Sequence, residues 1–166
     1  MTASDQISDR FEILDLMNRY ALAVDRRDWD LYRSVFAPDA RIDYRDSGGE
    51  VGALEPIVEW LSAVLAPFAG LQHNMGNHLV EFDADGDTAR ACTYFLAVHT
   101  SLDGRGEEVL LRVGGFYQDR LVRRDPGWRI AERVELSTWM DGPYPEDIPR
   151  PPWYGKTTRN LPSIPG

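Results

Sequence analysis

The chain has 166 residues, of which 43% are hydrophobic and 27% are charged, and its formal net charge is −9. These values fit one globular domain with a real hydrophobic core, and the acidic charge argues against a nucleic-acid partner, which would need a basic surface. No apolar run approaches the roughly 20 residues that span a bilayer, and the first residues lack the features of a signal peptide. We therefore expect a cytoplasmic protein with no membrane partner.

The first part of the chain has the periodicity of helices. Apolar residues recur every three or four positions between Phe11 and Val24, which predicts an amphipathic helix. The predicted elements are, in order, a helix over 8–24, a short helix over 31–36, a turn at 37–40, a short strand over 41–44 and a helix over 54–65.

The rest of the chain reads as long strands separated by turn residues. Four runs rich in Val, Leu, Phe, Tyr and Thr predict strands over 71–82, 88–101, 107–123 and 128–140. The pair Gly114-Gly115 predicts a bend or bulge in the third of them. The predicted class is α+β, with three N-terminal helices on one side of a curved antiparallel sheet.

No linker interrupts this pattern, so residues 1–142 are expected to form one domain. Residues 143–166 are rich in proline and include Trp153 and Tyr154. Such a tail is not expected to form a regular element. It is either a partly ordered terminus or a strap over a pocket mouth or a neighbouring subunit.

His73 is the first candidate for chemistry. Strict alternation along its strand places His73 on one face with Met75, Asn77 and Leu79, which makes it a candidate acid or base in an enclosed site. An aspartate that binds one imidazole nitrogen fixes the tautomer and raises the basicity of the other, and Asp25 could supply that carboxylate. Each residue also has a plainer interpretation, as a structural histidine and a helix-end aspartate.

The sequence indicates neither a metal nor a cofactor. It contains no glycine-rich phosphate loop and no motif for a nucleophile or a zinc site. The three histidines are His73, His78 and His99, and the first two should point to opposite faces of one strand.

Several segments resemble SnoaL-like proteins of the nuclear-transport-factor-2-like superfamily. They are Asn18 to Asp25, Phe36 to Ala40, His73 to His78, Gly115 to Asp119 and Gly127 to Ile130, within a resemblance that covers about residues 7–140. The resemblance implies a cone-shaped α+β barrel. It is strongest to the cofactor-free lyases scytalone dehydratase, bile-acid 7α-dehydratase and hexachlorocyclohexane dehydrochlorinase, in which a helix-end aspartate and a strand histidine form a dyad.

The resemblance also implies site residues. Asp25 and His73 match the dyad, Tyr20 matches a tyrosine of the first helix, and Arg133 matches an arginine of the last long strand. The predicted substrate-binding residues are His99, Asn77, Met75 and Trp139. Tyr20 and Asp25 are about 140° apart on an ideal helix, so we expect both to face one pocket only if the helix frays between them. Alternation places Arg133 opposite Trp128, Ile130 and Glu132.

We therefore predict a cofactor-independent lyase or isomerase, dehydratase-like, that acts on a hydrophobic cyclic hydroxylated or carbonyl substrate. His73, held by Asp25, would abstract a proton, and Tyr20 and Arg133 would stabilise the oxyanion or the leaving group. One alternative is a polyketide-cyclase-type aldol enzyme with an aspartate base. Another is a non-catalytic assembly subunit, such as a dioxygenase β subunit, which would have a filled cone. The resemblance also implies a homodimer or homotrimer.

Overall fold

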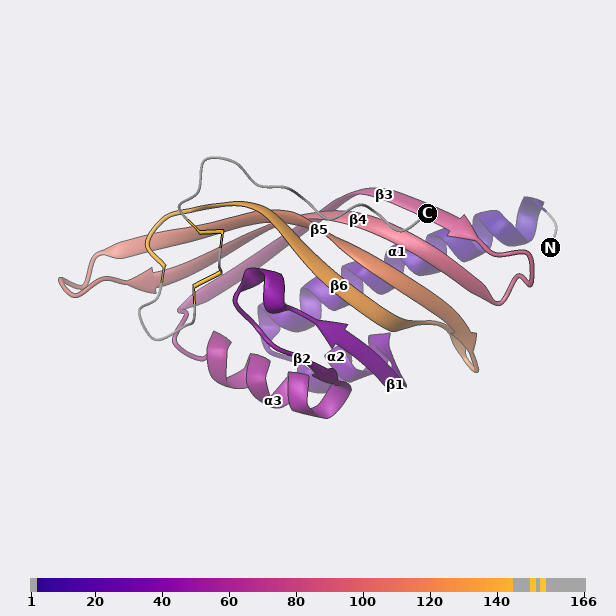
Figure 1. The fold of residues 1–166 in the computed structure, drawn as a ribbon, viewed down its shortest axis with the longest axis horizontal. Coiled ribbons are helices and arrows are strands. Elements are labelled where there is room, and N and C mark those ends of the chain that lie inside the picture. The colour runs from indigo at the N-terminus through magenta and orange to yellow at the C-terminus, as the bar shows by residue number, and fades with distance from the viewer. Residues whose placement is uncertain (1–2, 145–149, 152, 155–166) are drawn as a thin grey trace.

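A computed structural model describes residues 3–144, 150–151 and 153–154 (Figure 1). Its helices are α1 (Ala3–Arg26), α2 (Trp29–Val35), α3 (Leu54–Leu65) and the 3-10 turn η1 (Arg45–Ser47). Its strands are β1 (Phe36–Asp43), β2 (Val51–Ala53), β3 (Gly70–Phe82), β4 (Thr88–Leu102), β5 (Glu108–Arg124) and β6 (Gly127–Asp141). The three helices and the four long strands are those expected from the sequence. The short strand β2 was not expected.

The strands form one sheet in the order β2-β1-β6-β5-β4-β3. The α+β class, with three helices and a curved sheet, is confirmed, and the sheet differs from the expected antiparallel barrel in two respects. The sheet is mixed, because β1 runs parallel to β6, and it is unclosed, because β2 and β3 are its edges. Hydrophobic patterns place a strand but do not give its direction. Figure 1 shows α1 along the curved sheet and α3 near the C-terminal end of α1.

Local hydrogen bonds explain where the first elements end. Arg27 adopts a left-handed φ of 54°, and the backbone N–H groups of Arg27 and Asp28 donate to Val24 and Ala23. This Schellman pattern ends α1 and leaves Asp25 in its last turn. Asp28 then caps α2, because its side chain accepts a hydrogen bond from the backbone of Leu31. The second helix therefore begins earlier than the predicted residue 31.

The expected turn at 37–40 is instead part of β1. Residues 37–40 fall between the two stretches where β1 pairs with β6, at Phe36 and from Arg41 onward. Pro38, which cannot donate a backbone hydrogen bond, is tolerated in this gap in the ladder.

Besides the gap in β1, three irregularities in the strand ladder change which side chains face the helices. One extra residue lies in β3 between Gly76 and Leu79, and Asn77 there has a left-handed φ of 49°. Two more lie in β6, at Ala131 and at Thr138, the second of them opposite Gly114-Gly115. Each bulge shifts the alternation by one residue. The irregularity expected at the glycine pair is present, but its extra residue lies in the facing strand β6 and not in β5 itself.

The side chains of the inner face form the core with α1, α2 and α3. The fully buried members include Ile13 and Leu16 of α1, Ile57 of α3, and Trp128 and Ile130 of β6. In the described part of the chain no helix is long and apolar enough to cross a membrane.

Candidate active site

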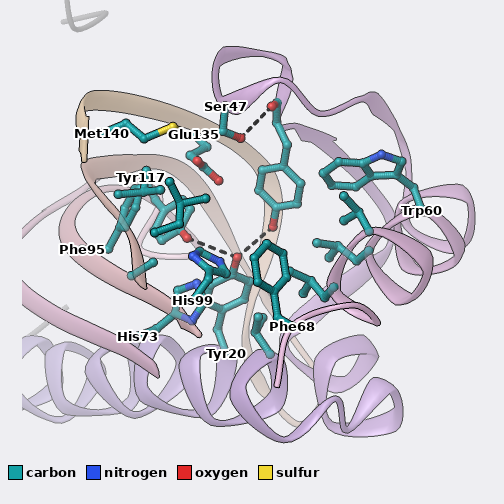
Figure 2. Close-up of a pocket in the computed structure, with 18 of the residues that line it drawn as sticks. Tyr20, Ser47, Trp60, Phe68, His73, Phe95, His99, Tyr117, Glu135 and Met140 are labelled. Carbon is teal, nitrogen blue, oxygen red and sulfur yellow. Dashed lines mark hydrogen bonds between the residues drawn. The ribbon is translucent and has the colours of Figure 1, made fainter. Parts of the chain in front are cut away.

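A cavity of about 110 Å³ opens between the inner face of the sheet, the C-terminal half of α1, and α3 (Figure 2). Its walls are mostly apolar and aromatic, with Trp60, Leu61 and Leu65 from α3 and Phe95 and Val113 from the sheet. Among the described residues its ionisable lining groups are Tyr20, Tyr44, His73, His99, Tyr117, Glu135 and Tyr144. The cavity is therefore an apolar space with a few polar groups, as small-molecule sites usually are.

The predicted partners Asp25 and His73, 48 residues apart in sequence, are in contact. Oδ1 of Asp25 lies 2.7 Å from Nδ1 of His73, and Oδ2 accepts the backbone N–H of His73 at 3.0 Å. Both carboxylate oxygens thus bind one residue and fix its ring. With Nδ1 engaged, Nε2 is the ring nitrogen available at the cavity that His73 lines.

The helix does not fray between Tyr20 and Asp25, so the condition under which both would face one pocket is not met. Helix α1 continues to Arg26, with Tyr20 in the cavity wall. Asp25 need not face the cavity, because it binds His73 from the helix end. Arg27 secures this junction, since its guanidinium donates to the backbone carbonyls of Leu65 and Phe68 at 3.1 and 2.6 Å.

Tyr20 belongs to a chain of buried phenols. The hydroxyl of Tyr32 lies 3.0 Å from that of Tyr44, which lies 3.0 Å from that of Tyr20, and Tyr20 donates to Tyr117 at 3.3 Å. Each phenol has one proton, so if Tyr20 donates to Tyr117, Tyr44 donates to Tyr20 and Tyr32 to Tyr44. The O–H of Tyr117 is then left for another acceptor. Burial raises the pKa of Tyr117 well above its ordinary value, so this hydroxyl stays protonated.

Arg133 does not line the cavity, which corrects its predicted direct role. Its guanidinium binds both carboxylate oxygens of Asp119 at 2.7 Å, and both side chains are fully buried. The guanidinium carbon lies 4.0 Å from the ring centre of Tyr20 and 4.2 Å from that of Tyr117. Because of the bulge at Ala131, Arg133 shares the buried face with Trp128 and Ile130, whereas Glu132 is exposed.

Of the predicted substrate-binding residues, His99 lines the cavity. Its ring centre lies 5.9 Å from that of His73 and 4.9 Å from that of Phe68. Burial, together with the nearby His73, lowers the pKa of His99 to about 4, so this ring is neutral at physiological pH. A role for His99 in binding substrate stays a prediction.

The other three predicted substrate-binding residues do not line the cavity. Asn77 is exposed at the bulge of β3, and Trp139 is 45% exposed because the bulge at Thr138 turns it outward. The same bulge brings Met140 into the cavity wall instead. Met75 packs against the core beside its strand partner Phe95.

Glu135 was not predicted from the sequence. It lies on β6 beside Tyr117 of β5 and lines the cavity (Figure 2). The hydroxyl of Ser137 donates to its Oε1 at 3.2 Å. Burial raises the pKa of Glu135 to about 7, against the opposing effects of Ser47, His73 and Ser137. Its position two residues after Arg133 was the available signal, because two residues along a strand share a face.

The predicted strap lies partly outside the described residues. Within them, Tyr144 lines the cavity and donates to the carbonyl of Ser47 at 3.1 Å. The indole of Trp153 donates to the carbonyl of Asp46 at 2.8 Å, and Tyr154 packs on Tyr144. The described residues contain no group of three or more His, Cys, Asp or Glu side chains placed to hold a metal ion.

The model of the SnoaL-like domain matches residues 5–134. The chain belongs to the SnoaL-like family. It is 41% identical over 140 residues to the uncharacterized protein Rv2910c of Mycobacterium tuberculosis H37Rv, a match that covers 84% of this chain and 92% of the relative.

Two solved structures show the same fold. A scytalone dehydratase-like protein from Novosphingobium aromaticivorans has a TM-score of 0.75 and 18% identity, over 95% of this chain and 100% of its own. The hexachlorocyclohexane dehydrochlorinase LinA-type3 from Novosphingobium barchaimii LL02 has a TM-score of 0.72 and 19% identity, over 85% of this chain and 94% of its own. The nuclear-transport-factor-2-like fold is confirmed, and at this identity the two likenesses show the fold alone.

Proposed function

We propose that the chain is a cofactor-independent lyase that removes a proton next to the carbonyl group of a small cyclic substrate and then expels a neighbouring group. The observation that carries the proposal is the two-point contact of Asp25 with His73 at the wall of an apolar cavity. The names of the two solved structures, a dehydratase and a dehydrochlorinase, describe eliminations and agree with it.

His73 is the base in this proposal. Asp25 orients the ring through Nδ1 and stabilises the imidazolium that forms when Nε2 takes a proton. The walls beside His73 are mostly apolar, and surroundings of low polarity strengthen this electrostatic support.

Tyr117 is the donor to the substrate oxygen. Proton removal places negative charge on the carbonyl oxygen, and the free O–H of Tyr117 can donate to it. The phenols behind Tyr117 polarise this O–H through their own hydrogen bonds. Arg133 contributes from beneath the rings of Tyr20 and Tyr117 without touching the substrate.

The cavity limits the size of the substrate. An engineered protein cavity of about 150 Å³ holds one benzene ring. A volume of about 110 Å³ therefore favours a compound with one ring over a polycyclic one.

The geometry favours neither alternative function. An aldol enzyme of the predicted kind would need an aspartate free to act as the base, but both oxygens of Asp25 bind His73. An assembly subunit was expected to have a filled cone, whereas this inner face borders a cavity.

The proposal is tested by elimination from 3-hydroxycyclohexanone, followed by the ultraviolet absorbance of cyclohexenone. We expect turnover by the wild type and a roughly 10²–10⁴-fold loss of kcat in His73→Asn. Equal turnover by the two proteins would exclude His73 as the base.

A further inference from the structure

We propose that Glu135 is the general acid of this elimination, and that the substrate is accordingly an uncharged ring compound that loses a hydroxyl group as water. This inference rests on the proposed function and deepens it, because a base alone does not determine which leaving group departs.

The first observation that supports this role is the position of Glu135 in the cavity. Glu135 and His73 line the same cavity from strands separated by β5 and β4, so a ring bound between them meets one group from each side (Figure 2). The ladder pairs Glu135 with Tyr117, which keeps the acid beside the proposed oxyanion donor. Ser137, donating to Oε1, fixes one oxygen of the carboxyl group.

The second support is the set of charges around Glu135. Among the described residues, the ionisable groups that interact electrostatically with it are His73 of β3, Asp46 of η1, Tyr20 of α1, Tyr32 of α2, Tyr117 of β5 and Tyr144. None of these is a permanent cation, and Arg133, two residues earlier on β6, is paired with Asp119. Burial therefore dominates and holds the pKa of Glu135 at about 7, which suits a proton donor at neutral pH.

The third support is the chemistry of the leaving group. His73 takes the proton from carbon, and the electron pair of that C–H bond becomes the new C=C bond. The C–O bond at the next carbon breaks with its electron pair on oxygen, and this oxygen takes the carboxyl proton of Glu135 and leaves as water. Proton transfer from the His73 imidazolium to the Glu135 carboxylate restores both groups. A halide would leave as a stable anion and would need no such donor.

The lining also favours an uncharged substrate. Neither lysine nor arginine lines the cavity within the described residues. A carboxylate or phosphate would enter an apolar space without a counter-cation and beside Glu135, at a large desolvation cost.

The test uses two probes that give the same product, 3-hydroxycyclohexanone and 3-chlorocyclohexanone, with spontaneous elimination subtracted. We expect Glu135→Gln to lower kcat on the hydroxyl probe by about 10²-fold or more and to leave the chloro probe within about threefold of wild type. Glu135→Asp, which keeps the acid, should recover part of the hydroxyl activity. Glu132→Gln is the matched control, because Glu132 is exposed on the same strand, and it should behave as wild type.

The pH profile gives a second readout. Turnover of the hydroxyl probe should fall as pH rises through about 7, because the protonated acid is lost, and turnover of the chloro probe should not show this fall. Equal effects of Glu135→Gln on both probes, or hydroxyl turnover that rises through pH 7 in a Glu135-dependent way, would overturn the assignment.

Failure of the proposed function would give a different pattern of activities from failure of the Glu135 assignment. If His73→Asn keeps full activity on both probes, the proposed base is wrong, whereas a loss confined to the hydroxyl probe in Glu135→Gln would still support the acid. If the wild type eliminates neither group, both proposals are overturned.

Discussion

Asp25 binds the ring and the backbone of His73 with separate oxygens, so its replacement disturbs two contacts at once. We expect Asp25→Asn to lower kcat by roughly 10²–10⁴-fold, because an amide cannot accept both hydrogen bonds or balance an imidazolium. The rate of cyclohexenone formation measures this. Asp15→Asn, on the exposed face of α1, is the control and should be neutral. A loss in both variants would contradict a specific role for Asp25.

The raised pKa of Glu135 predicts how the stability of the fold depends on pH. Its unfolded pKa is near 4.5 and its folded pKa about 7, so the folded state binds more protons between these values. Stability should therefore fall as pH rises from 4.5 to 7, and the penalty is complete above pH 7. Glu135→Gln should be more stable than wild type at pH 8 by on the order of 1–3 kcal/mol and similar at pH 4. Urea unfolding at the two pH values measures it, and an equal difference at both would contradict this linkage.

Among the secondary-structure elements, those that local sequence patterns define were predicted correctly. The 54–65 helix and the four long strands were found because their periodicity and turn residues are local. The pairing of Asp25 with His73 came from the family resemblance, which carries information about tertiary contacts. The misplaced residues Asn77, Arg133 and Trp139 share one physical cause, because each lies at or beyond a bulge that strict alternation does not include. Glu135 was missed for a different reason, since no sequence pattern reports how deeply a carboxyl group is buried.

The bulge at Thr138, opposite Gly114-Gly115, is open to a direct test. A Cβ at Gly115 would collide with the backbone carbonyl of Leu136, which cannot move without disturbing the ladder. We expect Gly115→Ala to destabilise the fold by about 1–3 kcal/mol in urea unfolding. Gly104→Ala, at an exposed turn where a Cβ meets nothing within 4 Å, should change stability by less than about 0.5 kcal/mol. Equal stability of the two variants would argue against a close approach at Gly115.

The buried ion pair between Asp119 of β5 and Arg133 of β6 leads to another prediction. Removing Asp119 leaves the Arg133 guanidinium charged and buried among aromatic rings, so Asp119→Ala should cost about 3–5 kcal/mol. Asp141→Ala breaks the exposed pair with Arg112 and should cost less than about 1 kcal/mol. Thermal unfolding of both variants gives the comparison, and equal costs would contradict the structural role assigned to Arg133.

For the whole molecule, the outer face of the sheet bears on the proposed homodimer or homotrimer. Exposed apolar side chains gather there, namely Leu79, Tyr94, Leu96, Val134 and Trp139. Patches of this kind mark association surfaces. We expect light scattering after gel filtration to give a dimer or trimer, and Leu96→Asp to give a monomer. Leu102→Asp, at the exposed end of β4, should leave the assembly intact. A monomeric wild type would contradict the proposal.

The proposed function requires that His73, held by Asp25, removes a proton from carbon. Cyclohexanone has no leaving group, so exchange of its α-protons in D₂O, followed by proton NMR, isolates that step. We expect the wild type and Glu135→Gln to catalyse the exchange at similar rates, and His73→Asn and Asp25→Asn to lose it. Exchange that persists at the wild-type rate in His73→Asn would contradict the account.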